Sequence, residues 1–138
     1  MNPVHILLAE DNNGDVFLIQ EALHAHHIAH ALHVVRDGSE ALDFVLRMGT
    51  SDLPCPDLIL LDLNLPKAEG TQVLGAIRKR SECSETPVIV VTSSDAPMDK
   101  ERVAKLGITS YFKKPFDLDE YMLLGATVLQ VLEARPHP

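Results

Sequence analysis

The chain has 138 residues, 46% of them hydrophobic, which is enough for one substantial core but short for two ordinary domains. With few aromatic residues and no Trp, the core depends on Val, Ile, Leu and Ala, a composition typical of a parallel sheet covered by helices. Twenty acidic against twelve basic residues give a net charge of −8, which disfavours nucleic acid and anionic lipid as partners.

Short apolar runs alternate with segments of helical period five times along the chain, a pattern typical of βα units in one domain that spans residues 1–138. The first two strands are expected at Val4–Ala9 and residues 31–35. Leu58–Leu61 and residues 88–91 are continuously apolar, which predicts central strands covered on both faces. Ser110–Lys113 is the expected fifth strand.

Apolar residues at spacings of three and four mark the helices between these strands. The residues expected to be buried are Val16, Ile19 and Leu23, then Ala41, Leu42, Val45 and Leu46, then Val73, Leu74 and Ile77, and in one long final helix Leu118, Tyr121, Met122, Val128, Leu129 and Leu132. Asp15 is expected to cap the first helix. The fourth helix, residues 99–106, has few apolar residues, so we expect it to be weakly docked and to end at Gly107.

Right-handed crossovers between such units predict an α/β fold, a doubly wound five-stranded parallel sheet of flavodoxin-like order 2-1-3-4-5 with helices on both faces. Ligands of open α/β sheets bind outside the carboxyl ends of the strands. Glu10 and Asp11 follow the first strand, Asp62 follows the third, Thr92 follows the fourth and Lys114 follows the fifth. These residues should meet in one crevice.

Three carboxylates in one crevice repel one another unless a cation neutralises them. A few hard oxygen ligands, with room for several waters, suit Mg²⁺ better than an all-protein Ca²⁺ cage. Any one of these acids alone could be an ordinary capping or turn residue. Five ordered positions are not explained in that way, so the sequence predicts a Mg²⁺ site.

These residues resemble the receiver domain of two-component response regulators. The resemblance rests on Glu10-Asp11, on Asp62 within the run Leu-Ile-Leu-Leu-Asp-Leu-Asn-Leu-Pro, on Thr92-Ser93 and on Lys114-Pro115. It extends over the whole chain, and thirty positions separate Asp62 from Thr92 and twenty-two separate Thr92 from Lys114, as in the family. The stretch from Asp11 to Asp62 is longer than the family pattern, and we assign the extra length to a loop at residues 48–56.

The resemblance implies that Asp62 accepts a phosphoryl group and that Glu10, Asp11, Asp62 and the Asn64 backbone carbonyl hold Mg²⁺, some through water. Such a domain is a phosphoacceptor switch rather than an enzyme, although it assists its own phosphorylation and dephosphorylation. Offsetting the charge of the phosphate would allow the Asp62 carboxylate to act as a nucleophile toward it.

The resemblance also implies roles for three residues around the phosphoryl group. Lys114 would pair with a phosphoryl oxygen and find its main partner only in the phosphorylated state, and a cis bond to Pro115 would aim its ammonium into the crevice. Thr92 would donate a hydroxyl hydrogen bond. Tyr111 matches an aromatic that changes rotamer on activation, although an ordinary edge-strand aromatic is the alternative.

Two groups of potential metal or redox residues lie outside this pattern. Cys55 and Cys83 fall in predicted loops without the spacing of a metal knuckle or redox pair, so we expect free thiols in a reducing cytosol. The histidines of residues 24–33 lack Cys or acidic partners, and interaction with a helix end explains them better than zinc or phosphohistidine chemistry. The N-terminal apolar stretch is far too short to span a membrane, so we expect a cytoplasmic protein.

Within the family, the motifs around Asp62 and Thr92 resemble stand-alone regulators paired with phytochrome-type histidine kinases. Since only residues 135–138 follow the last expected helix, we expect no output domain. The signal would then pass through protein contacts of the fourth helix, fifth strand and fifth helix, including a symmetric homodimer through this face.

Two other functions share this architecture. A flavodoxin-like cofactor binder needs a Ser, Thr or Gly-rich phosphate loop after the first strand, where Glu10 and Asp11 stand. A haloacid-dehalogenase-like phosphohydrolase needs a second acid two positions after its nucleophile, where Asn64 stands.

Overall fold

The sheet in the computed structural model, which describes residues 3–135, is parallel and has five strands in the order β2-β1-β3-β4-β5. The strands are β1 (Val4–Ala9), β2 (His30–Val35), β3 (Leu58–Leu61), β4 (Val88–Thr92) and β5 (Ser110–Lys113). The predicted fold class and strand order are confirmed. The strand bounds also agree with the prediction to within one residue.

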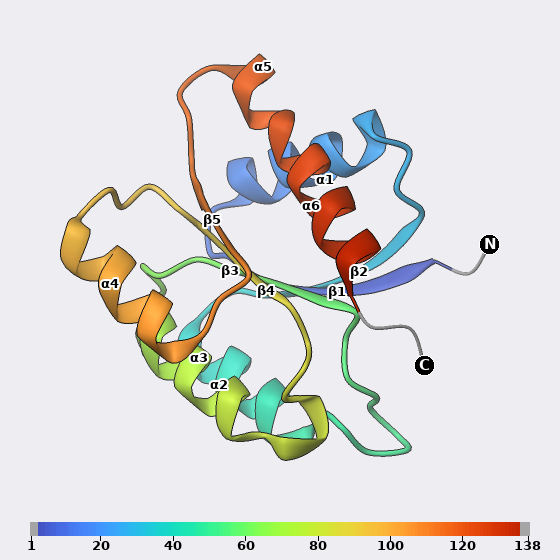
Figure 1. The fold of residues 1–138 in the computed structure, drawn as a ribbon, viewed down its shortest axis with the longest axis vertical. Helices are drawn as coiled ribbons and strands as arrows, with labels where there is room; N and C mark the ends of the chain where they lie inside the picture. Colours follow the sequence, from blue (N-terminus) through green and yellow to red (C-terminus); the bar gives the residue numbers. More distant parts are fainter. Residues whose placement is uncertain (1–2, 136–138) are drawn as a thin grey trace.

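Helices cover both faces of the sheet (Figure 1). One face is covered by α1 (Asn13–Ala25), the short α5 (Leu118–Tyr121) and α6 (Leu123–Ala134), and the other by α2 (Gly38–Arg47), α3 (Gly70–Lys79) and α4 (Pro97–Leu106). Every residue of β3 and β4 is buried, because successive side chains of these strands enter opposite cores. None of the helices described is long and apolar enough to cross a membrane.

The first two helices differ in detail from the prediction. Asn12, not Asp15, caps α1, since the Asn12 side chain accepts the Asp15 backbone N–H at 2.9 Å. Phe44 of α2 and Met48, which caps the helix, are buried, whereas Leu46 is 70% exposed. The apolar positions of α2 were ambiguous because Leu42 and Leu46 form a second row at the same spacing of four.

The last two helices also show one confirmation and one correction. Val103 is the one buried residue of α4, against four in α3, and Gly107 ends the helix at a φ of 99°. The sparse docking of α4 is confirmed. The predicted long final helix is wrong, because the chain turns at Met122 between α5 and α6. Gly125 then packs so closely on α1 that a Cβ there would lie 2.4 Å from Ala22 O.

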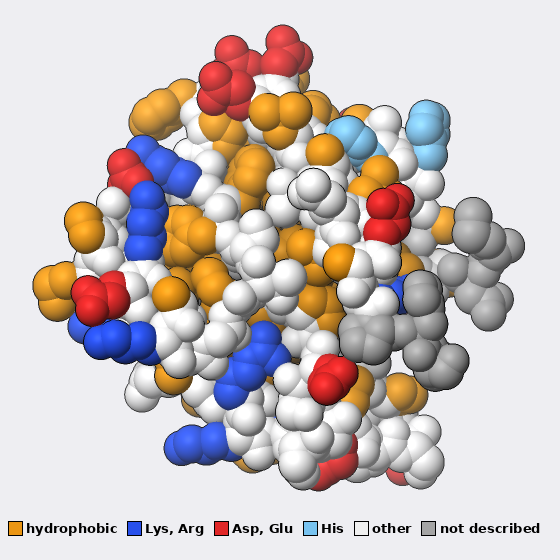
Figure 2. All heavy atoms as spheres, in the orientation of Figure 1, with side chains coloured by type: hydrophobic (Ala, Val, Ile, Leu, Met, Phe, Trp, Pro, Cys, Tyr) orange, Lys and Arg blue, Asp and Glu red, His pale blue; other side chains and the backbone are white. Residues whose placement is uncertain are grey.

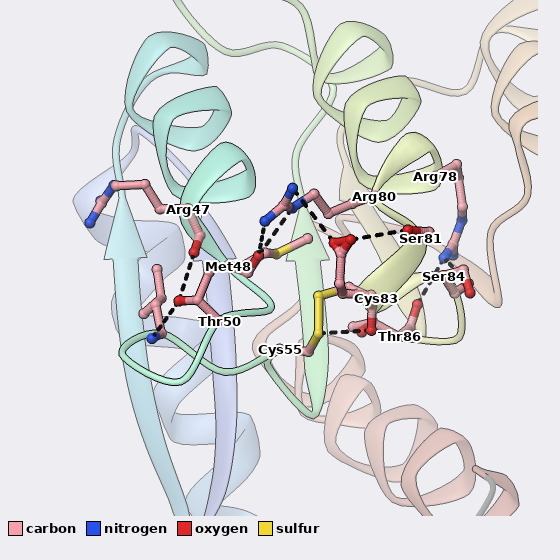
Figure 3. The surroundings of a disulfide bond; sticks show 12 residues. Arg47, Met48, Thr50, Cys55, Arg78, Arg80, Ser81, Cys83, Ser84 and Thr86 are labelled. Atoms are coloured by element: carbon pink, nitrogen blue, oxygen red, sulfur yellow. Dashed lines mark hydrogen bonds and ion pairs between the residues drawn. A yellow bond between two sulfur atoms is a disulfide. The ribbon is translucent and has the colours of Figure 1, made fainter.

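A disulfide joins Cys55, in the loop before β3, to Cys83 in the 3₁₀ turn η1 (Ser81–Cys83), so the prediction of free thiols is wrong (Figure 3). The side chain of Arg80 fastens the same two segments, because its Nε and Nη2 donate to Met48 O at 3.0 and 2.7 Å. A separation of 28 positions carries no pairing signal, since only the completed sheet brings these loops together. The disulfide lies at the edge of the sheet opposite the carboxyl ends of the strands.

Candidate functional site

Five of the predicted site residues lie at the carboxyl edge of the sheet, as expected for parallel strands. Glu10 and Asp11 follow β1, Asp62 follows β3, Lys114 follows β5 and Thr92 ends β4. Glu10, Asp62 and Thr92 are at most 5% exposed, whereas Asp11 is exposed. The crevice therefore places buried acids beside one residue that is open to solvent.

The Lys114 ammonium lies at the centre of the crevice. Its Nζ is 2.6 Å from Glu10 Oε1, 2.9 Å from Asp15 Oδ2 and 3.0 Å from Asp62 Oδ2. The expectation that Lys114 has no main partner before phosphorylation is therefore wrong. The bond to Pro115 is trans, which corrects the suggested cis bond. The ammonium reaches the crevice because Lys114 N–H donates to Thr92 O at 2.8 Å and so continues the pairing of β4 with β5.

Asp15 and Tyr121 belong to this crevice, although neither was predicted as a site residue. The Tyr121 hydroxyl, on a side chain that is 2% exposed, donates to Asp15 Oδ1 at 3.1 Å. Asp15 lies four positions after Asp11, one helical turn farther along the chain, and this spacing could have indicated it. Its place at the start of the helix also fits a helix cap, a role that Asn12 fills instead. Tyr121 carried no local signal, because it approaches from α5.

Burial and charge shift the acid-base behaviour of three residues in the crevice. Burial raises the pKa of Glu10 to about 7, and the charge of Asp62 adds to this rise while Lys114 opposes it. Burial lowers the pKa of Lys114, but hydrogen bonds with Glu10 and Asp15 outweigh it and raise the pKa above its ordinary value. The pKa of Tyr121 is also raised, by burial and then by the charge of Asp15. The Lys114 ammonium and the Tyr121 hydroxyl therefore both keep their protons at neutral pH.

The acids of the crevice could hold a divalent cation. Glu10, Asp11 and Asp62 each offer an oxygen, and these three atoms lie within 4.8 Å of one another. Carboxylate oxygens are the ligands that Mg²⁺ prefers, so these three residues would hold the cation together with water. Asn64, which is exposed, lies in the loop after β3 and donates its N–H to Asp62 Oδ1 at 3.2 Å. Within residues 3–135 the histidines form no comparable cluster of three or more ligands.

Thr92 and Tyr111 contact the same residue on the way to α4. Ser94 N–H donates to Thr92 Oγ1 at 3.3 Å, and the Tyr111 hydroxyl donates to Ser94 O at 2.8 Å. The ammonium of Lys100, in α4, lies 5.6 Å from the centre of the Tyr111 ring. The loop after β4 thus connects the crevice with both α4 and the aromatic of β5.

Comparison with known proteins agrees with this geometry. The sequence model of the family described as response regulator receiver domain matches residues 6–124 of this chain. Response regulator Rcp1 of Synechocystis is 39% identical over 119 residues, which cover 86% of this chain and 81% of that protein. The phosphorylated cyanobacterial phytochrome response regulator RcpA has a TM-score of 0.85 at 34% identity, with 96% of both chains covered.

The Mn²⁺-bound form of Rcp1 also has a TM-score of 0.85, at 36% identity and with 99% of both chains covered. Such close agreement over nearly the whole chain favours neither the flavodoxin-like nor the haloacid-dehalogenase-like alternative. The chain belongs to the family of response regulator receiver domains and is similar to the response regulator Rcp1 and to the phytochrome response regulator RcpA.

Proposed function

We propose that Asp62 accepts a phosphoryl group from a sensor histidine kinase and that the domain then signals through protein contacts. The observation that carries this proposal is the buried Asp62 carboxylate, which lies between the Lys114 ammonium at 3.0 Å and the oxygens of Glu10 and Asp11. A carboxylate in such surroundings is held in place and partly neutralised, as attack on phosphorus requires.

The divalent cation in this proposal is Mg²⁺, held by Glu10, Asp11, Asp62 and the backbone carbonyl of Asn64. The three carboxylate oxygens within 4.8 Å support this ligand set, as does the Mn²⁺ reported for Rcp1, because both ions take oxygen ligands. The bound cation supplies charge neutralisation for the transferred phosphoryl group.

The side chains of the crevice carry the rest of the transfer. An Asp62 carboxylate oxygen forms a bond to phosphorus while the bond from phosphorus to the histidine nitrogen of the kinase breaks, and the nitrogen keeps that electron pair. Lys114 pairs with a phosphoryl oxygen, and Thr92 donates its hydroxyl to another. Later hydrolysis of the acyl phosphate restores Asp62, so the domain is a switch rather than an enzyme with an external substrate.

The contacts of Ser94 support a route for the signal. Movement of the Thr92 hydroxyl toward a phosphoryl group would pull on the Ser94 N–H that it accepts, and the Tyr111 hydroxyl is bonded to the same residue. A rotamer change of Tyr111 would then follow from movement of this loop. Since α4 buries only Val103, its displacement costs little.

The face formed by α4, β5 and α5 is the proposed homodimer surface. It exposes basic residues on α4, namely Lys100, Arg102 and Lys105, and acidic residues at α5, namely Asp117, Asp119 and Glu120. Figure 2 shows basic side chains over α4 and an acidic group at α5 on one side of the molecule. A twofold axis would bring each charge group against its opposite on the second copy.

The upstream partner is proposed to be a phytochrome-type histidine kinase in the cytoplasm, because RcpA, whose structure resembles this chain with a TM-score of 0.85, is a phytochrome response regulator. The net charge of −8 supports a protein rather than a nucleic acid as the target of the signal.

Phosphoryl uptake from phosphoramidate, followed by intact-protein mass spectrometry with Mg²⁺ or with EDTA, tests the proposal. We expect wild type to gain one phosphoryl group with Mg²⁺ only, and Asp62→Asn to gain none. Asp43→Asn, which changes an exposed carboxylate of α2, is the matched control and should behave as wild type. Uptake by Asp62→Asn at the wild-type rate would refute the proposal.

A further inference from the structure

The Lys114 ammonium has three carboxylate acceptors, which differ in what the proposed function asks of them. It carries three N–H donors, and the oxygens of Glu10, Asp15 and Asp62 surround it at 2.6, 2.9 and 3.0 Å. In the proposed function, Glu10 and Asp62 turn oxygens to the cation, and Asp62 becomes an acyl phosphate. Asp15 is the one acceptor of the three that neither event uses.

Asp15 is also held more completely than a surface acid would be. Its backbone N–H donates to Asn12 Oδ1 at 2.9 Å, which fixes it in the first turn of α1. Its Oδ1 accepts the Tyr121 hydroxyl at 3.1 Å, which leaves Oδ2 directed at Lys114. The two oxygens thus have separate partners, one from α5 and one from the residue after β5.

We propose that Asp15, oriented by Tyr121, is a positioning residue that keeps the Lys114 ammonium over Asp62 when Glu10 and Asp62 release it. This inference rests on the proposed function. With one N–H held by Asp15, the ammonium turns its remaining donors to the phosphoryl oxygens. Without Asp15, the flexible Lys114 side chain has to be ordered during the transfer, which costs rate.

The same hydrogen bonds would be present if Asp15 only joined α1 to α5. The test must therefore show that the effect of Asp15 depends on Lys114. A double-mutant cycle does this, with Asp15→Asn made in wild type and in Lys114→Met and all four proteins held in saturating Mg²⁺. Tyr121→Phe removes one hydroxyl and no charge. Glu21→Gln makes the same charge change at an exposed position of α1 and is the control.

Two readouts are needed, namely the rate of phosphoryl uptake from phosphoramidate and the affinity for beryllofluoride measured by calorimetry. Residues in one hydrogen-bonded network are coupled, so we expect Asp15→Asn to weaken both readouts at least about fivefold in wild type and less than about twofold in Lys114→Met. Tyr121→Phe should weaken them in the same direction by a smaller factor. Glu21→Gln should leave both unchanged.

Equal losses in both backgrounds, or no loss in wild type, would overturn the positioning role. If Lys114→Met takes up too little phosphate to measure, the beryllofluoride affinities of the four proteins alone decide the comparison. If it does not fold, unchanged readouts in Tyr121→Phe and Asp15→Asn overturn the proposal, and losses in both support it. Failure of the proposed function is recognised separately, because Asp62→Asn would then still accept phosphate.

Discussion

Replacing Lys114 with Met should destabilise the protein when no divalent cation is present. The ammonium, on a side chain that is 11% exposed, lies within 3.0 Å of three carboxylates, and Met fills a similar volume without the charge. Each pair at about 3 Å is worth roughly 5 kcal/mol gross at an effective dielectric constant of about 20. Burial cancels most of this, and removing one partner of a buried ion pair costs about 3–5 kcal/mol net.

Urea unfolding followed by circular dichroism, at pH 7.5 in EDTA and in Mg²⁺, measures this loss. We expect Mg²⁺ to restore most of the stability of Lys114→Met and to stabilise wild type less, because the cation neutralises the same carboxylates. Lys113→Met is the matched control, since among residues 3–135 the ammonium of Lys113 pairs with the exposed Asp95 alone and should contribute under about 1 kcal/mol. Equal stability of wild type and Lys114→Met in EDTA would refute the reasoning.

Three further predictions concern the disulfide, the pH and the loop that carries Asp62. Replacing Cys55 and Cys83 with Ser should lower the unfolding free energy by about 3–4 kcal/mol, because the disulfide closes a loop over a separation of 28 positions, and should leave phosphoryl uptake unchanged. Calorimetry under oxidising conditions measures this loss, and no loss would mean that the disulfide does not form. Because the pKa of Glu10 is raised from 4.5 to about 7, its contribution to stability is present below pH 4.5 and is lost as pH rises through 7. In urea titrations without divalent cations, Glu10→Gln should remove this part of the pH dependence, and an unchanged profile would contradict the shift. A Cβ on Gly70 would lie 2.5 Å from Asp62 O, so Gly70→Ala should displace the loop and weaken the Mg²⁺ affinity measured by calorimetry. Gly75→Ala is the control, because the space around Gly75 is open and its affinity should not change. Equal affinities of the two variants would contradict this prediction.

Much of the sheet and of the crevice could be predicted because the signals are local. An apolar run such as Leu58–Leu61 predicts both a strand and its burial, and the polar residue that follows each strand must lie at the carboxyl edge of the sheet. The placement of Asp62, Thr92 and Lys114 followed from that rule before any contact was known.

The features that the sequence did not predict depend on contacts between distant segments. Cys55 meets Cys83 only after β3 and α3 are in place, and Tyr121 reaches Asp15 across 106 positions. The ion pairs of Lys114 were missed for a different reason. The family resemblance assigns Lys114 to the phosphoryl group, whereas the charges of the crevice must also be balanced without phosphate.

The central claim is tested most directly by finding which residue carries the phosphoryl group. Borohydride reduces an acyl phosphate of aspartate to homoserine, so treatment of the phosphorylated protein, followed by proteolysis and peptide sequencing by mass spectrometry, marks the acceptor. We predict homoserine at position 62 and aspartate at positions 11 and 15, only in samples phosphorylated with Mg²⁺. Homoserine at another position, or none at position 62 in protein that has gained a phosphoryl group, would contradict the assignment of Asp62.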